Sequence, residues 1–577
     1  MGLLKKKDSS KLKKSMERLS GRRTGGEVSS LRPHMVEKPP PCSIGCPSGN
    51  DVRGVLTLIA QREKLGLSLE DAMDRAWKLE VETNPFPAVM GRVCPHPCED
   101  NCNRREKDGA VAINSVERVL GDWGIERKLE LEKGSFAGRQ GRIAIVGAGP
   151  SGLSCAYQLT RRGYEVTIFE ALDHPGGMLR YGIPSYRLPR AILDAEIRRI
   201  EDLGVEIRCG TSVGQDISLE DLRRDFDAVF VGIGAHSGKT MGIAGEDGHG
   251  VYTGTEFLRH VNSGGDVEVG QRVVVVGGGD TAVDAARVSL RLSSDVAGTS
   301  RRMGSDVTIL YRRTRTEMPA IDREIEEALE EGIKIEFLAA PIRVIRDGDG
   351  RMKALEVQRM RLGEPDDSGR RRPVPIEGDV YQLEAETMIT AVSQQPDWAQ
   401  LGGLCQEGSW LETDPWGKTE LEGVWSGGDV LRLGLATISI GQGRKAAEAI
   451  DAALRKTVPE SSNGRRAIGI ERIKLDYYPA AQRARRAILP ADQRLERPGE
   501  EADLGITREA ALLEVDRCFS CGKCFGCENC WMYCQNSGFS KVEDPLSAGR
   551  YFDVNLSVCN GCEKCGDVCP CGYIDVR

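Results

Sequence analysis

Short apolar runs that end in glycine are the clearest pattern along this chain. Residues 142–146 are Arg-Ile-Ala-Ile-Val and precede Gly147, and residues 272–276 are Arg-Val-Val-Val-Val and precede Gly277. A brief, continuous apolar run bounded by turn residues is typical of a strand that is buried on both faces of a parallel sheet. The two runs therefore predict two α/β nucleotide-binding domains, about 130 residues apart.

The first strand leads into a glycine-rich loop of the dinucleotide-binding type. Its glycines allow a tight turn, a close approach of the backbone to a pyrophosphate, and close packing of the next helix on the strand. The partial positive charge of that helix N-terminus faces the phosphates. A second strand, predicted over residues 165–169, ends in an acid where ribose hydroxyls bind. These features predict a dinucleotide site at Gly147, Gly149, Pro150, Ser151, Gly152 and Glu170.

The second loop has alanine in place of the third glycine, and the residues that we expect to contact a dinucleotide are Gly277, Gly279, Asp280 and Thr281. The next strand, residues 307–311, ends in Arg312 and Arg313 rather than in an acid. Guanidinium groups form bidentate hydrogen bonds with a 2′-phosphate, which an acid would repel. This favours NADP(H) over NAD(H). Because residues 291–305 lengthen the unit and blur its register, a solvated basic loop remains the alternative.

A later stretch is expected to return to the first site. Residues 424–429 are typical of a strand that ends in an acid, Asp429, and a helix is predicted to begin at Ala436 and Thr437. A helix N-terminus beside an isoalloxazine ring would stabilise negative charge on the reduced ring.

Length, charge and cysteine content narrow the class of protein. A chain of 577 residues exceeds one hydrophobic core. No apolar run has the length of a membrane span, and the net charge of −8 argues against a nucleic-acid binder. Residues 1–30 lack the apolar core of a signal peptide, so we expect a cytoplasmic protein. Clustered cysteines in such a chain predict metal or iron–sulfur ligands, and 19 are present.

The C-terminal cysteines match the run of bacterial ferredoxins, in which the fourth cysteine of each run binds the other cluster. This predicts two [4Fe–4S] clusters, one bound by Cys524, Cys527, Cys530 and Cys569, and the other by Cys534, Cys559, Cys562 and Cys565. Cys518 and Cys521 offer an alternative register for the first run, and Cys571 is left over. Zinc is the alternative metal, because paired C-x2-C elements also suit it.

The N-terminal cysteines form a second group, with three residues between neighbouring cysteines in each run: Cys42, Cys46, Cys94, Cys98 and Cys102. From the residues alone, one cluster held by four of the five is the simplest interpretation. Zinc or buried free thiols are the alternatives.

The order of these motifs resembles the glutamate synthase small-subunit family of flavoproteins, which includes the electron-input domains of dihydropyrimidine dehydrogenase. The resemblance covers about residues 42–455 and is carried by residues 147–152, 175–184, 277–282, 311–319 and 427–429. It implies FAD in the first site and NADPH in the second. Glu170 would then bind the FAD ribose and Asp429 the ribityl chain, with further FAD contacts from Gly177 and Leu179.

The same resemblance implies two N-terminal [4Fe–4S] clusters, with one oxygen ligand. Cys46, Cys94 and Cys98, with Glu117 at the position of the oxygen ligand, would complete the cluster nearest the flavin. The other cluster would retain only Cys42 and Cys102, because no cysteine pair precedes Cys42.

The expected fold class is α/β, with two Rossmann-like nucleotide-binding domains, an N-terminal helical iron–sulfur domain and a C-terminal ferredoxin-like module. The expected order is a basic tail (1–41), the helical iron–sulfur domain (42–135), the first part of the FAD domain (136–265), the NAD(P)H domain (266–385), the second part of the FAD domain (386–457), a linker (458–515) and the two-cluster module (516–577).

The expected function is that of an NAD(P)H:acceptor oxidoreductase, and no acid–base catalytic set is expected. Electrons would pass between NAD(P)H, FAD and [4Fe–4S] clusters to a protein partner or a ferredoxin, and the chain could form a homo-oligomer. The C-terminal module resembles a narrower branch, the iron–sulfur flavoproteins of dissimilatory sulfur metabolism, whose partner is dissimilatory sulfite reductase. The alternatives are a glutamate synthase small subunit, a bifurcating transhydrogenase subunit and a non-catalytic electron-transfer scaffold.

Overall fold

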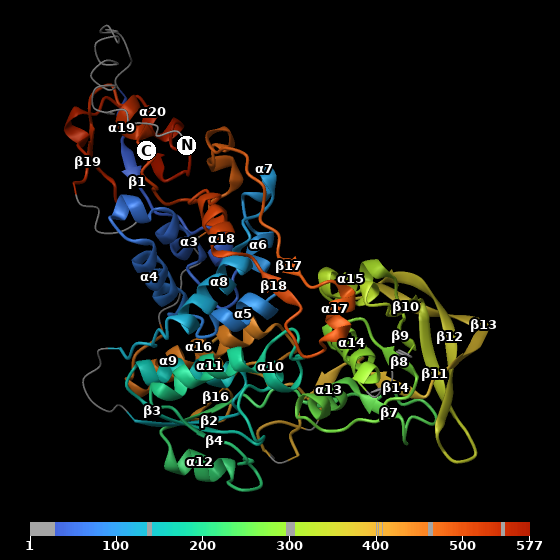
Figure 1. The fold of residues 1–577 in the computed structure, drawn as a ribbon. Helices are drawn as coiled ribbons and strands as arrows, with labels where there is room; N and C mark the ends of the chain where they lie inside the picture. The colour runs from blue at the N-terminus through green and yellow to red at the C-terminus, as the bar shows by residue number, and fades with distance from the viewer. Residues whose placement is uncertain are drawn as a thin grey trace.

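The computed structural model describes residues 29–134, 141–295 and 306–577, apart from 368, 400, 402, 407, 460–465 and 544–548. It confirms the expected α/β class. Two parallel sheets form separate nucleotide-binding domains, the helical N-terminal domain lies against the first of them, and the cysteine-rich C-terminal module lies at the far end of the helical domain (Figure 1).

The first sheet has the strand order β16-β5-β2-β3-β4, and all its neighbouring strands are parallel. Its strands are β2 (Arg142–Val146), β3 (Glu165–Phe169), β4 (Glu206–Arg208), β5 (Ala228–Val231) and β16 (Val424–Ser426). The helices of this domain are α9 (Pro150–Arg161), α10 (Met178–Tyr181), α11 (Arg190–Asp202), α12 (Leu219–Asp225) and α16 (Ala436–Leu454). Because β16 joins this sheet, the domain is built from two separate parts of the chain.

Close backbone packing explains two glycines of this domain. A Cβ on Gly152 would lie 2.0 Å from the Gly147 carbonyl oxygen, and a Cβ on Gly443 would lie 2.1 Å from the Ser151 carbonyl oxygen. Helix α9 therefore packs directly on the loop below it and on α16. Its first residue is Pro150, at a position where the missing N–H costs nothing.

The second sheet has the strand order β10-β9-β8-β14-β7, again all parallel. Its strands are β7 (Val251–Thr253), β8 (Arg272–Val276), β9 (Asp306–Tyr311), β10 (Lys334–Phe337) and β14 (Thr387–Thr390), and its helices are α13 (Gly254–Asn262), α14 (Asp280–Asp295) and α15 (Asp322–Glu330). A three-stranded antiparallel sheet extends it, formed by β11 (Ala339–Arg346), β12 (Met352–Pro365) and β13 (Arg371–Glu384).

The expected borders of this second domain, 266 and 385, need correction. Both β7 and β14 lie outside those borders, yet they form the far end of the second sheet. The chain crosses between the two domains at a two-stranded antiparallel pair, β6 (Ser237–Gly238) and β15 (Gln394–Gln395). Strands this short carry little periodicity, so the sequence placed the crossing too far into the second domain.

The N-terminal domain consists of helices α2 (Pro41–Ile44), α3 (Val52–Ala60), α4 (Leu69–Val81), α5 (Pro87–Val93), α6 (Pro97–Asp100), α7 (Arg105–Asp108) and α8 (Ile113–Glu126), with the 3-10 helix η1 (Arg62–Leu65). Helices α5 and α8 approach each other closely at two glycines. A Cβ on Gly91 would lie 2.3 Å from the Arg118 Cα, and a Cβ on Gly121 would lie 2.1 Å from the Ala88 nitrogen.

The C-terminal part contains β17 (Ala487–Ile488), α17 (Ala491–Glu496), β18 (Asp503–Gly505), α18 (Arg508–Asp516), α19 (Asn529–Tyr533), β19 (Phe539–Lys541), β20 (Phe552–Val554), α20 (Lys564–Asp567) and β21 (Ile574–Val576), with 3-10 helices η3 (Ile470–Arg472), η4 (Leu475–Tyr477) and η5 (Leu556–Val558). A further 3-10 helix, η2 (Arg315–Glu317), belongs to the second nucleotide domain.

Two expected segment descriptions change here. The expected tail 1–41 is ordered from residue 29 onward, because β1 (Pro33–Met35) pairs with β21, the last strand. The rest of that tail lies outside the described residues. The expected linker 458–515 is also more than a connection, because α18 packs against α3 and α8 of the N-terminal domain (Figure 1). The many charged residues of this segment are typical of an exposed linker, so the sequence did not predict the packing of α18.

We expect Gly121→Ala to lower the free energy of unfolding by about 1–3 kcal/mol, because the added methyl group forces α5 and α8 apart. Urea unfolding followed by tryptophan fluorescence would measure the loss, since Trp77 and Trp123 lie in this domain. Gly348→Ala is the control, because a Cβ there meets no atom within 4 Å. Equal stability of the two variants would contradict the prediction.

Candidate functional site

One cavity of about 500 Å³ lies between the two nucleotide-binding domains, at the carboxyl ends of their strands. Ligands of open α/β sheets bind at this edge. Ten of the expected FAD-site residues line the cavity: Gly147, Gly149, Pro150, Ser151, Glu170, Gly177, Leu179, Asp429, Ala436 and Thr437. The eleventh, Gly152, packs beneath the loop instead. Asp280 and Thr281 line the same cavity from the second domain, and Cys94 lines it from the N-terminal domain.

The floor of the cavity has the geometry that a pyrophosphate needs. Gly147 has a φ of 98°, which an L side chain rarely adopts. A Cβ on Gly177 would lie 2.8 Å from the Gly149 Cα, and a Cβ on Gly149 would meet only Gly177, at 4.0 Å. The two glycines thus leave room that side chains would fill. The residues present therefore fit a bound dinucleotide.

Glu170 fixes the loop from below. Its carboxylate accepts hydrogen bonds from the backbone N–H of Ala148 at 2.6 Å and of Leu172 at 2.9 Å. Burial raises the pKa of Glu170, and these backbone N–H groups oppose that rise. The carboxylate thus lies at the end of β3, where the sequence analysis expected it.

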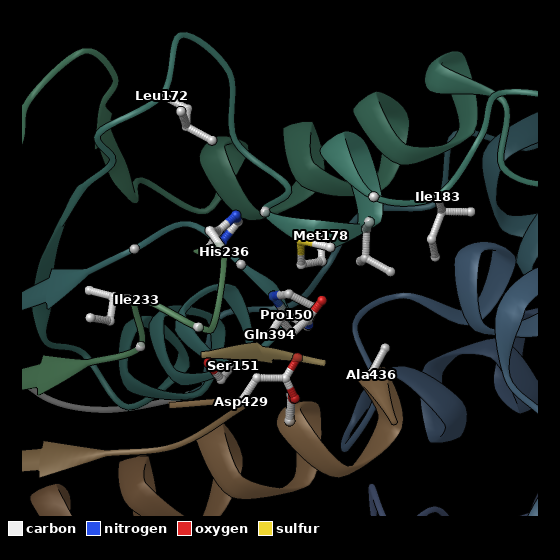
Figure 2. Close-up of a pocket in the computed structure, with 18 of the residues that line it drawn as sticks. Pro150, Ser151, Leu172, Met178, Ile183, Ile233, His236, Gln394, Asp429 and Ala436 are labelled. Carbon is white, nitrogen blue, oxygen red and sulfur yellow. The ribbon is translucent and has the colours of Figure 1, made fainter. Parts of the chain in front are cut away.

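Asp429 enters the cavity from the loop before α16 and lies among Ser151, Pro150 and Ala436 in the close-up view (Figure 2). It accepts a hydrogen bond from the Gly434 N–H at 3.1 Å, and burial raises its pKa to about 6. Helix α16 begins beside it with Ala436, so the positive end of a 19-residue helix dipole meets the cavity.

The sequence analysis missed His236 and Gln394, which also line the cavity (Figure 2). Burial lowers the pKa of His236 to about 4, so this imidazole is neutral at neutral pH. Its position just after β5 was the available signal, because residues at the carboxyl ends of parallel strands gather at one edge. Gln394 belongs to β15, which was too short to predict.

The second loop contributes less directly than expected. Gly277 and Gly279 do not line the cavity, although a Cβ on Gly279 would meet no atom within 4 Å and so leaves open space. Arg312 is exposed at the end of β9. Arg313 is buried, and it donates to Asp366 at 2.6 Å and to the Arg371 carbonyl at 2.7 Å. Of the two arginines, Arg312 is therefore the one that a 2′-phosphate could reach.

A buried ion-pair network holds the two halves of the cavity together. Arg187 of the first domain contacts Asp284 at 2.6 Å and Glu324 at 3.3 Å, both in the second domain. Arg287, which is fully buried, contacts Glu324 at 2.6 Å. Because removing one partner leaves an uncompensated buried charge, such a network strongly resists separation of the domains. Its other members are Arg291, Glu327, Glu331 and Arg494.

A second cavity, of about 30 Å³, lies beside the first. Cys46, Cys94, Cys98 and Glu117 all line it, and Cys94 and Thr437 line both cavities. Asn84 and Asn114 each donate to Glu117, at 3.0 and 3.1 Å, so its carboxylate is oriented. Burial raises the pKa of Glu117 well above its usual range. The four expected ligands of the cluster nearest the flavin are thus brought together at the edge of the dinucleotide cavity.

The C-terminal module brings its eight expected cysteine ligands together in two groups. One cavity is lined by Cys524, Cys527, Cys530 and Cys569, with Cys571 beside them, and the next by Cys534, Cys559, Cys562 and Cys565. This is the interlocked arrangement, and it sets aside the alternative register through Cys518 and Cys521. Within the described parts of the chain, no three His, Cys, Asp or Glu side chains converge closely enough to bind one metal ion. A [4Fe–4S] cluster requires a wider arrangement, because each cysteine binds a different iron.

Residues 141–443 match the family model described as pyridine nucleotide-disulphide oxidoreductase. This range is more than half of the chain. The chain belongs to this family. Residues 35–129 also match the model for domain II of dihydropyrimidine dehydrogenase, which is described as binding a 4Fe-4S cluster. The chain is therefore a flavin-dependent oxidoreductase with FAD, NADP(H) and [4Fe–4S] clusters as cofactors.

Curated relatives of this family member extend over most of its length. The beta subunit of an NADPH-Fe(3+) oxidoreductase from Geobacter sulfurreducens is 36% identical over 522 residues, which cover 83% of this chain and 75% of the relative. The beta subunit of an NADP(+)-dependent formate dehydrogenase from Moorella thermoacetica is 36% identical, with 83% and 70% covered. The small chain of glutamate synthase [NADPH] from Escherichia coli is 32% identical, with 71% and 88% covered. The resemblance to glutamate synthase small subunits is thereby confirmed.

Among solved structures, FprA of Mycobacterium tuberculosis in complex with NADPH has a TM-score of 0.47 and 21% identity, over 55% of this chain and 85% of FprA. No helix in the described ranges combines the length and the apolarity needed to cross a lipid bilayer.

We expect Glu170→Gln to weaken FAD binding about 10- to 100-fold, because a charged acceptor for the ribose hydroxyls is worth roughly 1.5–3 kcal/mol. Titration of flavin-free protein with FAD, followed by quenching of flavin fluorescence, would measure the affinity. Glu206→Gln, on the exposed edge strand β4 of the same sheet, is the control. Unchanged affinity in Glu170→Gln would exclude a role of this carboxylate in ribose binding.

Proposed function

We propose that this chain takes electrons from NADPH and passes them, through FAD and [4Fe–4S] clusters, to a protein partner. The observation that carries the proposal is the continuity of the cavities. One cavity extends from the first glycine loop to Asp280 of the second domain, and it shares Cys94 and Thr437 with the cavity of the nearest cysteine group. When bound, the flavin takes up an electron pair from the nicotinamide and releases electrons one at a time.

The residues of the chain orient and shield this exchange rather than act as acids or bases. Glu170, Gly149 and Gly177 hold FAD. Asp280 and Thr281 contact NADPH. Burial lowers the pKa of His236 to about 4, so this side chain is neutral at neutral pH and adds no positive charge to the cavity. The dipole of α16 stabilises negative charge that develops beside Ala436. The alternative of a scaffold without nicotinamide binding is disfavoured, because Asp280 and Thr281 line the shared cavity.

NADPH is the proposed donor, on the basis of Arg312 and of the relatives whose names include NADPH or NADP(+). We expect an anaerobic titration with NADPH to bleach the flavin and then to produce the EPR signals of reduced clusters, whereas NADH reduces them less readily. We expect Arg312→Ala to raise the KM for NADPH about tenfold without affecting NADH, because one charged contact to the 2′-phosphate is lost.

Arg315→Ala is the matched control, because Arg315 lies in the same loop but pairs with Asp322 at 2.7 Å. A flavin that neither nucleotide reduces would contradict the proposed function. An equal change of the KM for NADPH in the two arginine variants would contradict only the proposed role of Arg312, not the proposed function.

For the partner, we propose dissimilatory sulfite reductase, the partner of the iron–sulfur flavoprotein known as DsrL. The support is the domain order and the C-terminal two-cluster module, which glutamate synthase small subunits generally lack. The relatives that are named as subunits belong to different enzymes, an iron(III) reductase and a formate dehydrogenase, and so support an electron-transfer role in a complex rather than one partner.

We expect affinity isolation of the chain from its native cells to yield a sirohaem-containing sulfite reductase, detectable by its absorption spectrum and by mass spectrometry. Isolation of a large glutamine amidotransferase subunit would instead identify a glutamate synthase. A second flavoprotein would identify a bifurcating transhydrogenase. Either of these results would overturn the proposed partner without affecting the proposed electron path.

A further inference from the structure

Seven cysteines lie outside the three groups described above and outside their cavities, and four of them come from the cysteine-rich segments: Cys42, Cys102, Cys518 and Cys521. The structure brings them together. Burial raises the pKa of the Cys42 thiol, and the neighbouring Cys518, Cys521 and Cys102 raise it further. The side-chain amide of Asn103, the residue after Cys102, donates to the Cys521 sulfur at 3.5 Å. Cys42 is buried, and Cys102 and Cys518 pack against the same hydrophobic core.

We propose that Cys42, Cys102, Cys518 and Cys521 bind a fourth [4Fe–4S] cluster, shared between the N-terminal domain and the C-terminal segment. The upstream cysteine pair that the N-terminal domain lacks is supplied by residues more than 400 positions later in the chain. Binding forms one iron–sulfur bond per cysteine and releases one thiol proton per cysteine, with the iron and the sulfide provided as an assembled cluster.

Specific hydrogen bonds hold the segment of Cys518 and Cys521 next to the segment of Cys42. Arg53 donates to the Cys521 carbonyl at 2.7 Å and to the Lys38 carbonyl at 2.6 Å. The Lys38 N–H donates to the Gly522 carbonyl at 3.0 Å. Gly522 has a φ of 72°, and a Cβ on it would lie 2.7 Å from the Lys38 carbonyl oxygen. The segment after Cys521 is therefore packed against the chain just before Cys42 as closely as backbone allows.

The turn after Cys518 has the same geometry as the turns at the other cysteine sites. The N–H of Ser520 donates to the Cys518 sulfur at 3.4 Å, and Ser520 has a φ of 50°. The corresponding pairs at the expected ligands are Gly526 to Cys524 at 3.5 Å, Gly561 to Cys559 at 3.4 Å and His96 to Cys94 at 3.4 Å, each with a positive φ at the donor. Backbone N–H bonds to the sulfurs tune a cluster's potential, and a left-handed serine in this position matches a cluster-binding turn.

Short helices also place this site next to its neighbours. Cys42 lies in α2 and Cys46 just after its C-cap Gly45, and Cys98 lies in α6 with Cys102 just after its C-cap Asn101. One helical turn separates the members of each pair by about 6 Å. In each pair, one cysteine lines the cavity beside the flavin site and the other belongs to the shared site. The same Cys-x3-Cys spacing on α19 and α20 joins the two groups of the C-terminal module.

Two arginine side chains lie near the shared site. Burial raises the pKa of the Cys518 thiol to about 11, and Arg53 and Arg104 act against this rise. Phe519, the residue after Cys518, is buried, and its ring packs against Tyr478 with centroids 4.3 Å apart. The site is thus shielded from solvent, and it lies between the cluster site beside the flavin and the C-terminal module. It would connect the two halves of the relay proposed above, on which its role in electron transfer rests.

Iron content tests the site without depending on electron flow. We expect Cys518→Ser/Cys521→Ser to lose about four irons per chain relative to the wild type, and Cys42→Ser/Cys102→Ser to lose the same number. The quadruple variant is decisive, because two pairs that share one cluster lose about four irons together, whereas two separate sites lose about eight. Cys209→Ser, a partly exposed cysteine outside every group, is the control.

All variants are to be prepared anaerobically as the full chain, with FAD content measured beside iron and zinc. Unchanged iron in either double variant, additive loss in the quadruple variant, or zinc in place of iron would overturn the proposal. For the case that a variant fails to fold, thiol cross-linking of cluster-depleted wild-type protein with dibromobimane gives a second test. Peptides containing Cys42 or Cys102 must then be joined to those containing Cys518 or Cys521, and their absence would also overturn it.

The outcome is separable from that of the proposed function. If NADPH fails to reduce the flavin while the iron losses follow the expected pattern, the shared cluster stands and the electron donor is wrong. If the flavin is reduced normally in Cys518→Ser/Cys521→Ser but the C-terminal clusters are reduced at least tenfold more slowly than in the wild type, both proposals are supported.

Discussion

Buried and half-buried arginines hold the C-terminal segment against the N-terminal domain, and the placement of the cysteine groups depends on these contacts. Arg517 donates to the carbonyls of Gly109 and Ala110 at 2.8 and 3.1 Å, and Arg486 donates to the Gly91 carbonyl at 2.9 Å. Arg104 returns the contact by donating to the Pro479 carbonyl at 2.9 Å. A guanidinium has five donors, so one side chain can satisfy several buried carbonyls that would otherwise lack a partner. These hydrogen bonds fix residues 479–517 in position relative to the N-terminal helices.

The same principle operates at the junction of the nucleotide-binding domains. Arg187 bridges the first domain to Asp284 on α14, and Arg494 of α17 reaches Glu331 at 3.1 Å. A charged network of this kind favours one relative position of its parts over alternatives, because any shift leaves a buried charge unpaired. The nicotinamide loop, the flavin loop and the C-terminal segment are therefore fixed with respect to one another by charge, whereas each sheet is stabilised by its own apolar core.

Sequence patterns predicted what is local and missed what depends on distant contacts. The expected strands 142–146, 165–169 and 272–276 match β2, β3 and β8 residue for residue, because buried parallel strands are continuously apolar. Ten of the eleven expected FAD-site residues line one cavity, and the eight C-terminal cysteines group as the ferredoxin spacing predicts. Arg313 is paired with Asp366 in the turn between β12 and β13, and this contact with a distant part of the chain could not be read from the sequence. Cys518 and Cys521 looked surplus, because nothing near them in the sequence reveals their proximity to Cys42.

The pairing of β1 with β21 has a consequence for how the chain is made. About 540 residues separate the two strands, and at about 5–20 residues per second the ribosome needs roughly half a minute to two minutes to deliver the second after the first. During that interval the early cysteines have emerged, while β21 and Cys521, whose carbonyl accepts a hydrogen bond from Arg53, have not yet been synthesised. The segment around β1 therefore cannot reach its final packing before the last strand has been synthesised, although the helices between residues 41 and 126 are already complete.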